Sequence, residues 1–343
     1  MYSAGYLPIL CVIVGFLSAF ILSTIFVPIA KVIALRFNIL DIPDGKVKKH
    51  AVATPYLGGI AVYFATLITS FFIVPYDSSI FLLLCGTTIL LIVGLIDDLV
   101  VMRPSQKFIG QSIAVLIFLY GGFYLHIFAC SFFAMALSAL WILTIINAFN
   151  LIDVMDGLAT SVACSATCGF IIVALYLQQP VIAGIFACFA GALIGFLLYN
   201  WPHASIYLGD TGSLFIGGLL GALPLSLNFG ALGHWGYLAP LILLAIPLLE
   251  LTSLIVIRTS KKIPFYQGSP DHFSMYLQRH GWSKKNILFY VWIMSIILIG
   301  TTSGFVAGLF HPYQIIFFGL IFLFIWFVFL VRGCFLCSKN CSK

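Results

Sequence analysis

The sequence predicts an all-α fold, a polytopic membrane protein of ten or eleven transmembrane helices with its N-terminus outside. Of its 343 residues, 62% are hydrophobic and only 8% are charged, whereas soluble domains carry about 25% charged residues. Apolar runs of about 20 residues, the length that crosses a bilayer, recur along the whole chain. Because the backbone in lipid must satisfy its own hydrogen bonds, such runs are helices.

Eleven segments are candidates for these helices. They cover residues 5–30, 58–75, 79–96, 108–126, 128–149, 158–177, 181–199, 213–231, 236–257, 287–309 and 312–332. The segment at 108–126 is the weakest, since it contains Gln111 and several glycines, which leaves ten helices as the alternative. We find no soluble domain, so residues 1–343 are expected to form one integral membrane unit that ends in a short tail, 333–343.

The cations indicate which way the chain faces. With the N-terminus outside, all 16 lysines and arginines fall in the loops after the first, third and ninth segments or in the tail. Cytoplasmic loops are enriched in these residues, so this side is predicted to be cytoplasmic. The net charge of +6 therefore reflects topology. No long basic run points to a nucleic-acid partner.

The acids gather on the same side. Eight of the ten lie there: Asp41, Asp44, Asp97, Asp98, Asp153, Asp156, Asp210 and Asp271. Acids at the membrane edge are functional candidates, although isolated ones such as Asp41 and Asp44 are expected to be solvated loop residues. The adjacent pair at 97 and 98 is different, because two neighbouring carboxylates repel each other unless a cation or a phosphate-bound metal offsets their charge.

The stretch "NAFNLIDVMDGLAT" places Asn147, Asn150, Asp153 and Asp156 at intervals of three. On a continuous helix this spacing gives a slanting polar stripe over about three turns, before Gly157 marks a break. Polar contacts between membrane helices are the structural alternative. Four residues in register, two of them acidic, favour a functional site.

Two further motifs lie on this side of the membrane. In "YLGDTGSLFIGG", Asp210 stands between glycines that let a ligand approach the backbone, and carboxylates suit Mg²⁺ with bound phosphates. The loop after the ninth segment adds cations and two histidines, His272 and His280, which can meet phosphates. Carboxylates for metal together with cations for phosphate favour phosphoryl transfer, and the membrane location suggests a lipid substrate.

These motifs resemble the polyprenyl-phosphate N-acetylhexosamine-1-phosphate transferase family. The likeness runs in the family's order from "KKHAVATPYLGGIAV" to the loop after the ninth segment. It implies transfer of a sugar 1-phosphate from a UDP-sugar, such as UDP-N-acetylglucosamine, to polyprenyl (undecaprenyl) phosphate. UMP would be released with Mg²⁺ or Mn²⁺ as cofactor. The resemblance also implies an active site on the cytoplasmic face of a bacterial inner membrane, where such enzymes start lipid-linked glycans of cell wall or lipopolysaccharide.

The resemblance also assigns roles by matching position. It implies that Asp210 and Asp153 bind the metal, and that Asp97 and Asp98 handle the lipid phosphate. Catalysis is expected from Asp97, Asp98 and Asp153. Substrate contacts are expected from Asn147, Asn150, Asp156 (near the nucleotide), Lys49, His50 and His272. Glu250 matches an acidic position that is usual in the family's ninth helix.

The last loop departs from the family pattern. Members that act on N-acetylglucosamine often carry His-x-His-His there, and pentapeptide-type members carry three consecutive histidines. Here only His272 remains, with Ser274 and Met275 at the other two positions. The resemblance therefore leaves the sugar open, although the first loop is more similar to the N-acetylglucosamine branch.

Some residues also bear on other functional classes. A transporter would have acids near the middle of the membrane, whereas only Glu250 lies deep within a segment. "DGLA" also opens the signature of CDP-alcohol phosphotransferases, but Thr160 stands where that signature needs arginine. A catalytically silent relative in a membrane complex, and a homodimer, remain alternatives that the residues leave open.

Overall fold

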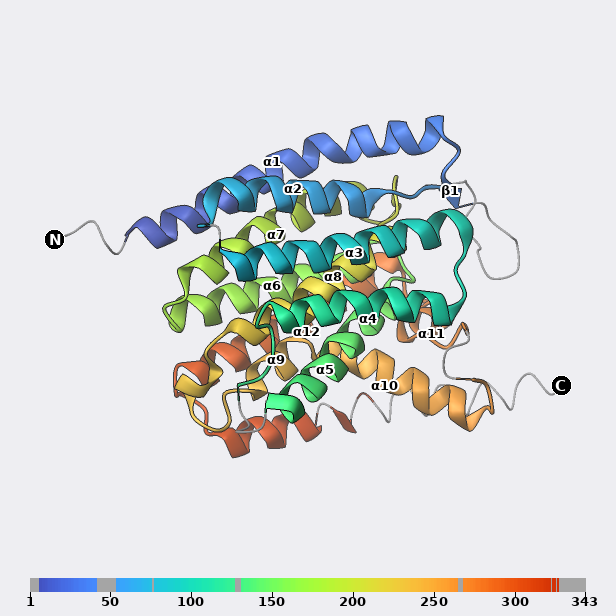
Figure 1. The fold of residues 1–343 in the computed structure, drawn as a ribbon. Helices are drawn as coiled ribbons and strands as arrows, with labels where there is room; N and C mark the ends of the chain where they lie inside the picture. The colour runs from blue at the N-terminus through green and yellow to red at the C-terminus, as the bar shows by residue number, and fades with distance from the viewer. Residues whose placement is uncertain are drawn as a thin grey trace.

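A computed structural model describes residues 6–41, 54–75, 77–126, 131–264, 268–321, 323, 324 and 326. The predictions on Lys49, His50 and the tail at 333–343 lie outside these residues. Within them the chain is almost entirely helical (Figure 1).

The helices follow one another with short connections. They are α1 (Tyr6–Arg36), α2 (Gly58–Ile73), α3 (Ser78–Val100), α4 (Pro104–Tyr120), α5 (Ser131–Ile152), α6 (Leu158–Tyr176), α7 (Pro180–Asn200), α8 (Gly209–Ala222), α9 (Leu238–Leu243), α10 (Ala245–Ser260), α11 (Phe273–Arg279) and α12 (Lys284–Val306), with two 3-10 turns, η1 (Leu223–Ser226) and η2 (Phe229–Leu232). A further helix covers Pro312–Ile321. One antiparallel pair of two-residue strands, β1 (Leu40–Asp41) and β2 (Thr54–Pro55), follows α1.

The prediction of a polytopic helical membrane protein is confirmed. Six of the described helices are long and apolar enough to cross a membrane: Ile9–Arg36, Ser78–Val100, Ser131–Ile152, Leu158–Tyr176, Pro180–Asn200 and Lys284–Val306. The helices at Gly58–Ile73 and Pro312–Ile321 are also apolar, but they are shorter.

Two predicted segments differ from the structure. The segment expected at 213–231 is the helix α8, which already begins at Gly209 and gives way to 3-10 turns after Ala222. The segment expected at 236–257 is broken at Leu244 into α9 and α10. The break has a local cause, because Pro247 lacks the N–H that would bond the carbonyl oxygen of Leu243.

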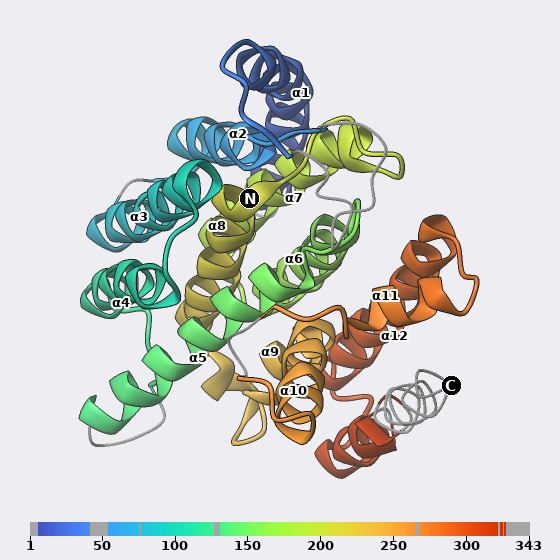
Figure 2. The ribbon, with the colours of Figure 1, turned by 90° about the vertical axis from the view of Figure 1, so that its right-hand side faces the viewer.

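Helix α8 lies in the middle of the bundle, in contact with α2, α3 and α5 (Figure 2). Every residue of α8 except Asp210 is buried. Small residues allow the close approach: a Cβ on Gly59 of α2 would stand 2.2 Å from the backbone nitrogen of Gly212, and one on Gly94 of α3 would stand 2.3 Å from the carbonyl oxygen of Asp210. The backbone that carries Asp210 is thereby fixed from two sides.

The ends of several helices meet at one end of the bundle. Figure 1 shows the end of α1, the link from α3 to α4, the end of α10 and helix α11 at the right-hand end. The loop between α7 and α8 joins them there, since Tyr207 donates its N–H to the carbonyl oxygen of Pro55 at 2.8 Å. This end therefore collects the described loops that carry the cations and most of the acids.

Candidate active site

The centre of the candidate site is an ammonium group held between two carboxylates. Nζ of Lys107, in the first turn of α4, lies 2.9 Å from Oδ2 of Asp97 and 2.5 Å from Oδ2 of Asp210. It also donates to Oδ1 of Asn150 at 3.1 Å, and Asn150 Nδ2 donates to Asp210 Oδ1 at 2.7 Å. The structure thus brings Asp97, Asn150 and Asp210 together from three helices.

Asp98 faces the start of α8 instead. Its carboxylate accepts hydrogen bonds from the backbone N–H of Asp210 at 2.8 Å and of Thr211 at 3.0 Å, and from the Thr211 hydroxyl at 2.6 Å. The first amides of a helix have no partner within it and carry partial positive charge, so a carboxylate stabilises them. Gly209 turns the chain into α8 at φ +75°, where a Cβ would lie 2.6 Å from Asp98 Oδ2.

The turn between α5 and α6 corrects the predicted continuous stripe. Helix α5 ends at Ile152, and residues 153–157 form a turn that leads to Gly157 at φ +71°. The side chain of Asn200 holds this turn by accepting the N–H of Gly157 at 2.9 Å and donating to the carbonyl oxygen of Ile206 at 3.0 Å. Asp153 and Asp156 are consequently presented by a turn and not by a helix face.

Asp153 is the acid of this group without a bonding partner. Among the residues that the structure describes, none donates a hydrogen bond to its carboxylate or pairs with it. Burial first, and then the charges of Asp210, Asp98 and Asp156, raise the pKa of Asp153 well above its usual range. A carboxylate placed among other carboxylates is one that a cation would stabilise.

The remaining residues of the predicted stripe have partners of their own. Asn147 Nδ2 donates to Oε1 of Gln111 in α4 at 3.0 Å, which ties α5 to α4 one turn away from Asn150. Asp156 Oδ2 accepts from Nζ of Lys284 at 2.8 Å and from the N–H of Ala204 at 3.3 Å. Asn147 and Asp156 are therefore bonded to neighbouring segments. Asn150 and Asp153 lie near Asp210 instead.

The loop after α10 has a different arrangement from the one its resemblance implies. His272 is 5% exposed, and its Nδ1 lies 2.9 Å from Oε1 of Glu250 in α10. Ser274 is fully buried, and its hydroxyl has no hydrogen-bond partner among the described residues. No described contact joins His272 to the group around Lys107, so its predicted role in substrate binding stays a prediction.

Two residues near the site, Lys107 and Asp41, make contacts that the sequence does not indicate. The sequence explains Lys107 by membrane topology alone, whereas in the structure its ammonium pairs with Asp97 across the α3–α4 corner and with Asp210. Asp41 was expected to be solvated, but it is 8% exposed and hydrogen-bonds the side chain of Tyr56. Burial and that hydrogen bond raise the pKa of Tyr56, with further contributions from Asp98 and Asp210. Asp44 lies outside the described residues.

The donor set suits Mg²⁺ when substrate phosphates complete the coordination. Mg²⁺ in proteins commonly uses one or two carboxylates together with phosphates and water, and Asp210 lies close enough for its charge to raise the pKa of Asp153. The described residues include no group of three side chains that could hold a metal by themselves. The ammonium of Lys107 stands between Asp97 and Asp210.

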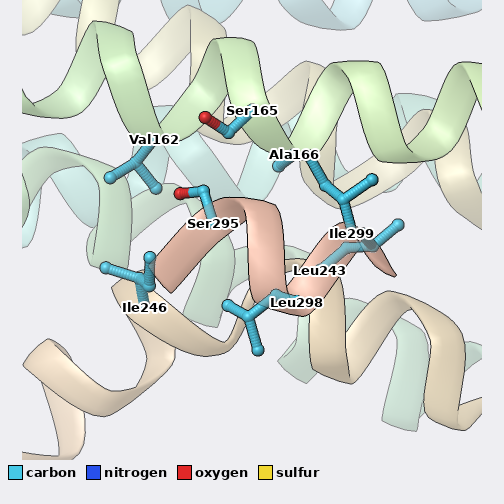
Figure 3. Close-up of a pocket in the computed structure, with 8 residues that line it drawn as sticks. All are labelled: Val162, Ser165, Ala166, Leu243, Ile246, Ser295, Leu298 and Ile299. Atoms are coloured by element: carbon cyan, nitrogen blue, oxygen red, sulfur yellow. The ribbon is translucent and has the colours of Figure 1, made fainter. Parts of the chain in front are cut away.

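A pocket elsewhere in the bundle is apolar and belongs to a different region. Figure 3 shows Ser165 on α6 and Ser295 on α12 among aliphatic side chains that include Val162, Leu298 and Ile299. It contains no acidic or basic side chain. The carboxylates described above therefore remain the candidate site.

Comparison with known proteins identifies the family. The family described as Glycosyl transferase family 4 matches residues 80–228, a range that runs from α3 to the end of η1 and includes Lys107 and Asp210. The chain is 32% identical over 322 residues to a phospho-N-acetylmuramoyl-pentapeptide-transferase of Clostridium beijerinckii, covering 86% of this chain and 94% of that protein. A similar transferase of Bacillus pumilus is 30% identical over 318 residues, with 84% and 94% covered.

A relative from the other branch is also similar. A probable undecaprenyl-phosphate N-acetylglucosaminyl 1-phosphate transferase of Bacillus subtilis is 26% identical over 296 residues, covering 83% of this chain and 82% of that protein. The matches span both branches, so they fix the family without fixing the sugar. On these grounds the chain belongs to glycosyl transferase family 4 and is a membrane phospho-sugar transferase.

Proposed function

We propose that this protein transfers a sugar 1-phosphate from a UDP-N-acetylhexosamine to a polyprenyl phosphate and releases UMP. The observation that carries the proposal is the group around Lys107: two carboxylates and a carboxamide share one ammonium at the end of an apolar bundle. Asp153, whose carboxylate has no bonding partner in the described part of the chain, lies close enough to feel the charge of Asp210. The similar proteins are named as an undecaprenyl-phosphate N-acetylglucosaminyl 1-phosphate transferase and a phospho-N-acetylmuramoyl-pentapeptide-transferase, which supports the same chemistry.

In this proposal the chain's own residues position and neutralise charge. Lys107 keeps Asp97 and Asp210 close together, and Asn150 orients Asp210 through a hydrogen bond of 2.7 Å. Asp210 and Asp153 would hold Mg²⁺, which when bound neutralises the diphosphate of the donor. Both oxygens of Asp98 accept bonds from α8, and those of Asp97 accept bonds from Lys107 and from the N–H of Met102, so either carboxylate must exchange a bond to meet the acceptor phosphate.

We assign the donor to the N-acetylglucosamine type. The support comes from the first cytoplasmic loop of the sequence and from the missing run of histidines, since Ser274 and Met275 replace two of them. The site is proposed to face the cytoplasm, where the cations lie. There the UDP-sugar would reach the carboxylates from water while the polyprenyl chain stays in lipid.

The test is UMP release by purified protein in detergent with undecaprenyl phosphate and Mg²⁺, across a panel of UDP-sugars and with a metal-free control. We expect Mg²⁺-dependent release with UDP-N-acetylglucosamine or a close relative. Asp153→Asn and Asp210→Asn should each abolish release while the protein still elutes as a folded species. Asp77→Asn is the matched control, because Asp77 caps α3 through the N–H of Ile80 and asparagine caps helices equally well.

Three other results would contradict parts of this proposal. Release that is the same with and without Mg²⁺, or normal turnover by Asp153→Asn, would refute the assigned roles. A folded wild-type protein that releases no UMP with any donor would favour a catalytically silent relative.

A further inference from the structure

We propose that Lys284 is a positioning residue that holds Asp156 in place for the nucleoside part of the donor. The inference rests on the proposed function and on the place near the nucleotide that the family resemblance implies for Asp156. Lys284 Nζ bonds Oδ2 of Asp156 at 2.8 Å, and the N–H of Ala204 reaches the same oxygen at 3.3 Å. Within the described part of the chain nothing bonds Oδ1. One oxygen is thus anchored while the other remains able to accept a hydrogen bond from a ligand.

Lys284 stands where a cation is otherwise unfavourable, which indicates that its charge is stabilised by the ion pair with Asp156. It is the first residue of α12, directly after the N-cap Ser283, and a cation is disfavoured at this end of a helix because the first amides are partially positive. The neighbouring Lys285 is exposed and has no partner among the described residues. Of two adjacent lysines in one turn, only Lys284 neutralises a buried carboxylate, whose side chain is 8% exposed.

The packing of α12 on neighbouring segments holds Lys284 next to Asp156. Leu288 of α12 packs onto the α5–α6 turn, where a Cβ on Gly157 would lie 3.2 Å from Leu288 Cδ1. Trp201, at the end of α7, meets Trp292 of α12 edge to face with ring centroids 5.7 Å apart. Helix α12 is therefore packed against the turn that carries Asp156 and against the end of α7.

The loop before α12 makes Lys284 more important in this chain. His272 is turned towards Glu250, Ser274 is fully buried, and Met275 carries no charge. Among the described residues that follow α10, Lys284 is the one whose charged group contacts a predicted donor-binding residue. We infer that the affinity for the donor depends on this contact.

The experiment compares Lys284→Met with Lys285→Met, which removes the same charge one residue away. Initial rates of UMP release are measured while the UDP-sugar and the polyprenyl phosphate are varied in turn, and UMP affinity is measured by calorimetry. We expect Lys284→Met to raise KM for the UDP-sugar and Kd for UMP about tenfold, a loss of about 1.4 kcal/mol. The kcat value and KM for the lipid should stay within about twofold. Lys285→Met should change none of these, and Lys284→Arg should restore most of the affinity.

A second comparison separates positioning from general stability. In an Asp156→Asn background, adding Lys284→Met should change UMP affinity by less than about twofold, because residues that act as one unit are not additive. A full tenfold effect in that background, an equal effect of Lys285→Met, or unchanged UMP affinity in Lys284→Met would overturn the proposal. If Lys284→Met does not fold, Lys284→Gln replaces it.

The two hypotheses fail differently. A wild-type protein that releases no UMP with any donor counts against the proposed function. A wild-type protein that turns over, or binds UMP, with no dependence on Lys284 counts against the positioning role alone.

Discussion

Asp98 Oδ1 accepts the backbone N–H of Asp210 at 2.8 Å, so an acid at the end of α3 caps the helix that carries the next acid of the site. The sequence places these residues more than a hundred positions apart. The bond links the two carboxylates through the backbone, and it sets where the Asp210 side chain can point. One member of the aspartate pair thus has a clear structural task, while the other contacts Lys107.

Replacing Asp98 should therefore reduce stability as well as activity. Asp98→Ala leaves two amides and a hydroxyl at the start of α8 without an acceptor, which should cost about 2 kcal/mol or more. Asp98→Asn keeps one acceptor oxygen and should cost less. Thermal unfolding in detergent measures both. Wild-type stability in Asp98→Ala together with complete loss of turnover would show that Asp98 acts on substrate instead.

Lys107→Met should be more damaging to turnover than the loss of any other described lysine. It leaves Asp97 and Asp210 facing each other without their shared cation, and breaking a buried ion pair from one side costs about 3 kcal/mol or more. We expect turnover to fall by about 100-fold or more, as when a charge-stabilising group is removed. The matched control is Arg103→Met, an exposed cation just before α4. Comparable loss in both variants would contradict the specific role.

Asp153→Asn should make the metal-free protein more stable. The pKa of Asp153 is raised by burial and by neighbouring carboxylates, so the folded state binds the proton more tightly than the unfolded state does. Stability is then lost as the pH rises from about 4, the usual value for aspartate, towards the raised value. At pH 7 the asparagine variant avoids this cost. Melting curves should show a higher midpoint for the variant without metal.

Mg²⁺ should reverse that order. A ligand that binds only the folded state raises the melting temperature, and wild type should gain more from Mg²⁺ with UMP than Asp153→Asn does. Equal gains in the two proteins would show that Asp153 takes no part in holding the metal.

Gly59→Ala should disrupt the site from a distance. The added Cβ would stand 2.2 Å from the nitrogen and 2.3 Å from the Cα of Gly212, and neither backbone atom can move aside without shifting α8. We expect poor folding or a large drop in the melting temperature. Gly300→Ala in α12 is the control, because nothing lies within 4 Å of its Cβ and alanine favours a helix by up to about 1 kcal/mol over glycine. Similar behaviour of the two variants would argue against the close packing of α2 on α8.

Much of the fold could be predicted because an apolar run in a bilayer satisfies its own backbone hydrogen bonds by forming a helix. The segments from 5–30 to 181–199 and the one at 287–309 correspond to helices of the structure, with shifted ends. The broken segment at Leu244 was missed, although Pro247 gave a local signal. Helix α8 was placed four residues too late, because its start at Gly209 depends on Asp98 of another helix.

The candidate site was predictable in its residue types and less so in its geometry. Asp97, Asn150 and Asp210 were expected together and lie together. The three-residue spacing suggested one helix face, but the Asn200 side chain, far away in sequence, stabilises a turn there. Lys107 could not be assigned by spacing alone, since a lysine at a membrane edge has a sufficient explanation in topology.

The ion pair of Lys107 also bears on how the protein is made. Lys107 lies 10 residues from Asp97 but 103 residues from Asp210. During synthesis, Lys107 can pair with Asp97 within the α3–α4 hairpin long before α8 leaves the ribosome. Asp210 then joins an existing pair, whereas Asp98 gains its hydrogen-bond donors only when α8 is made.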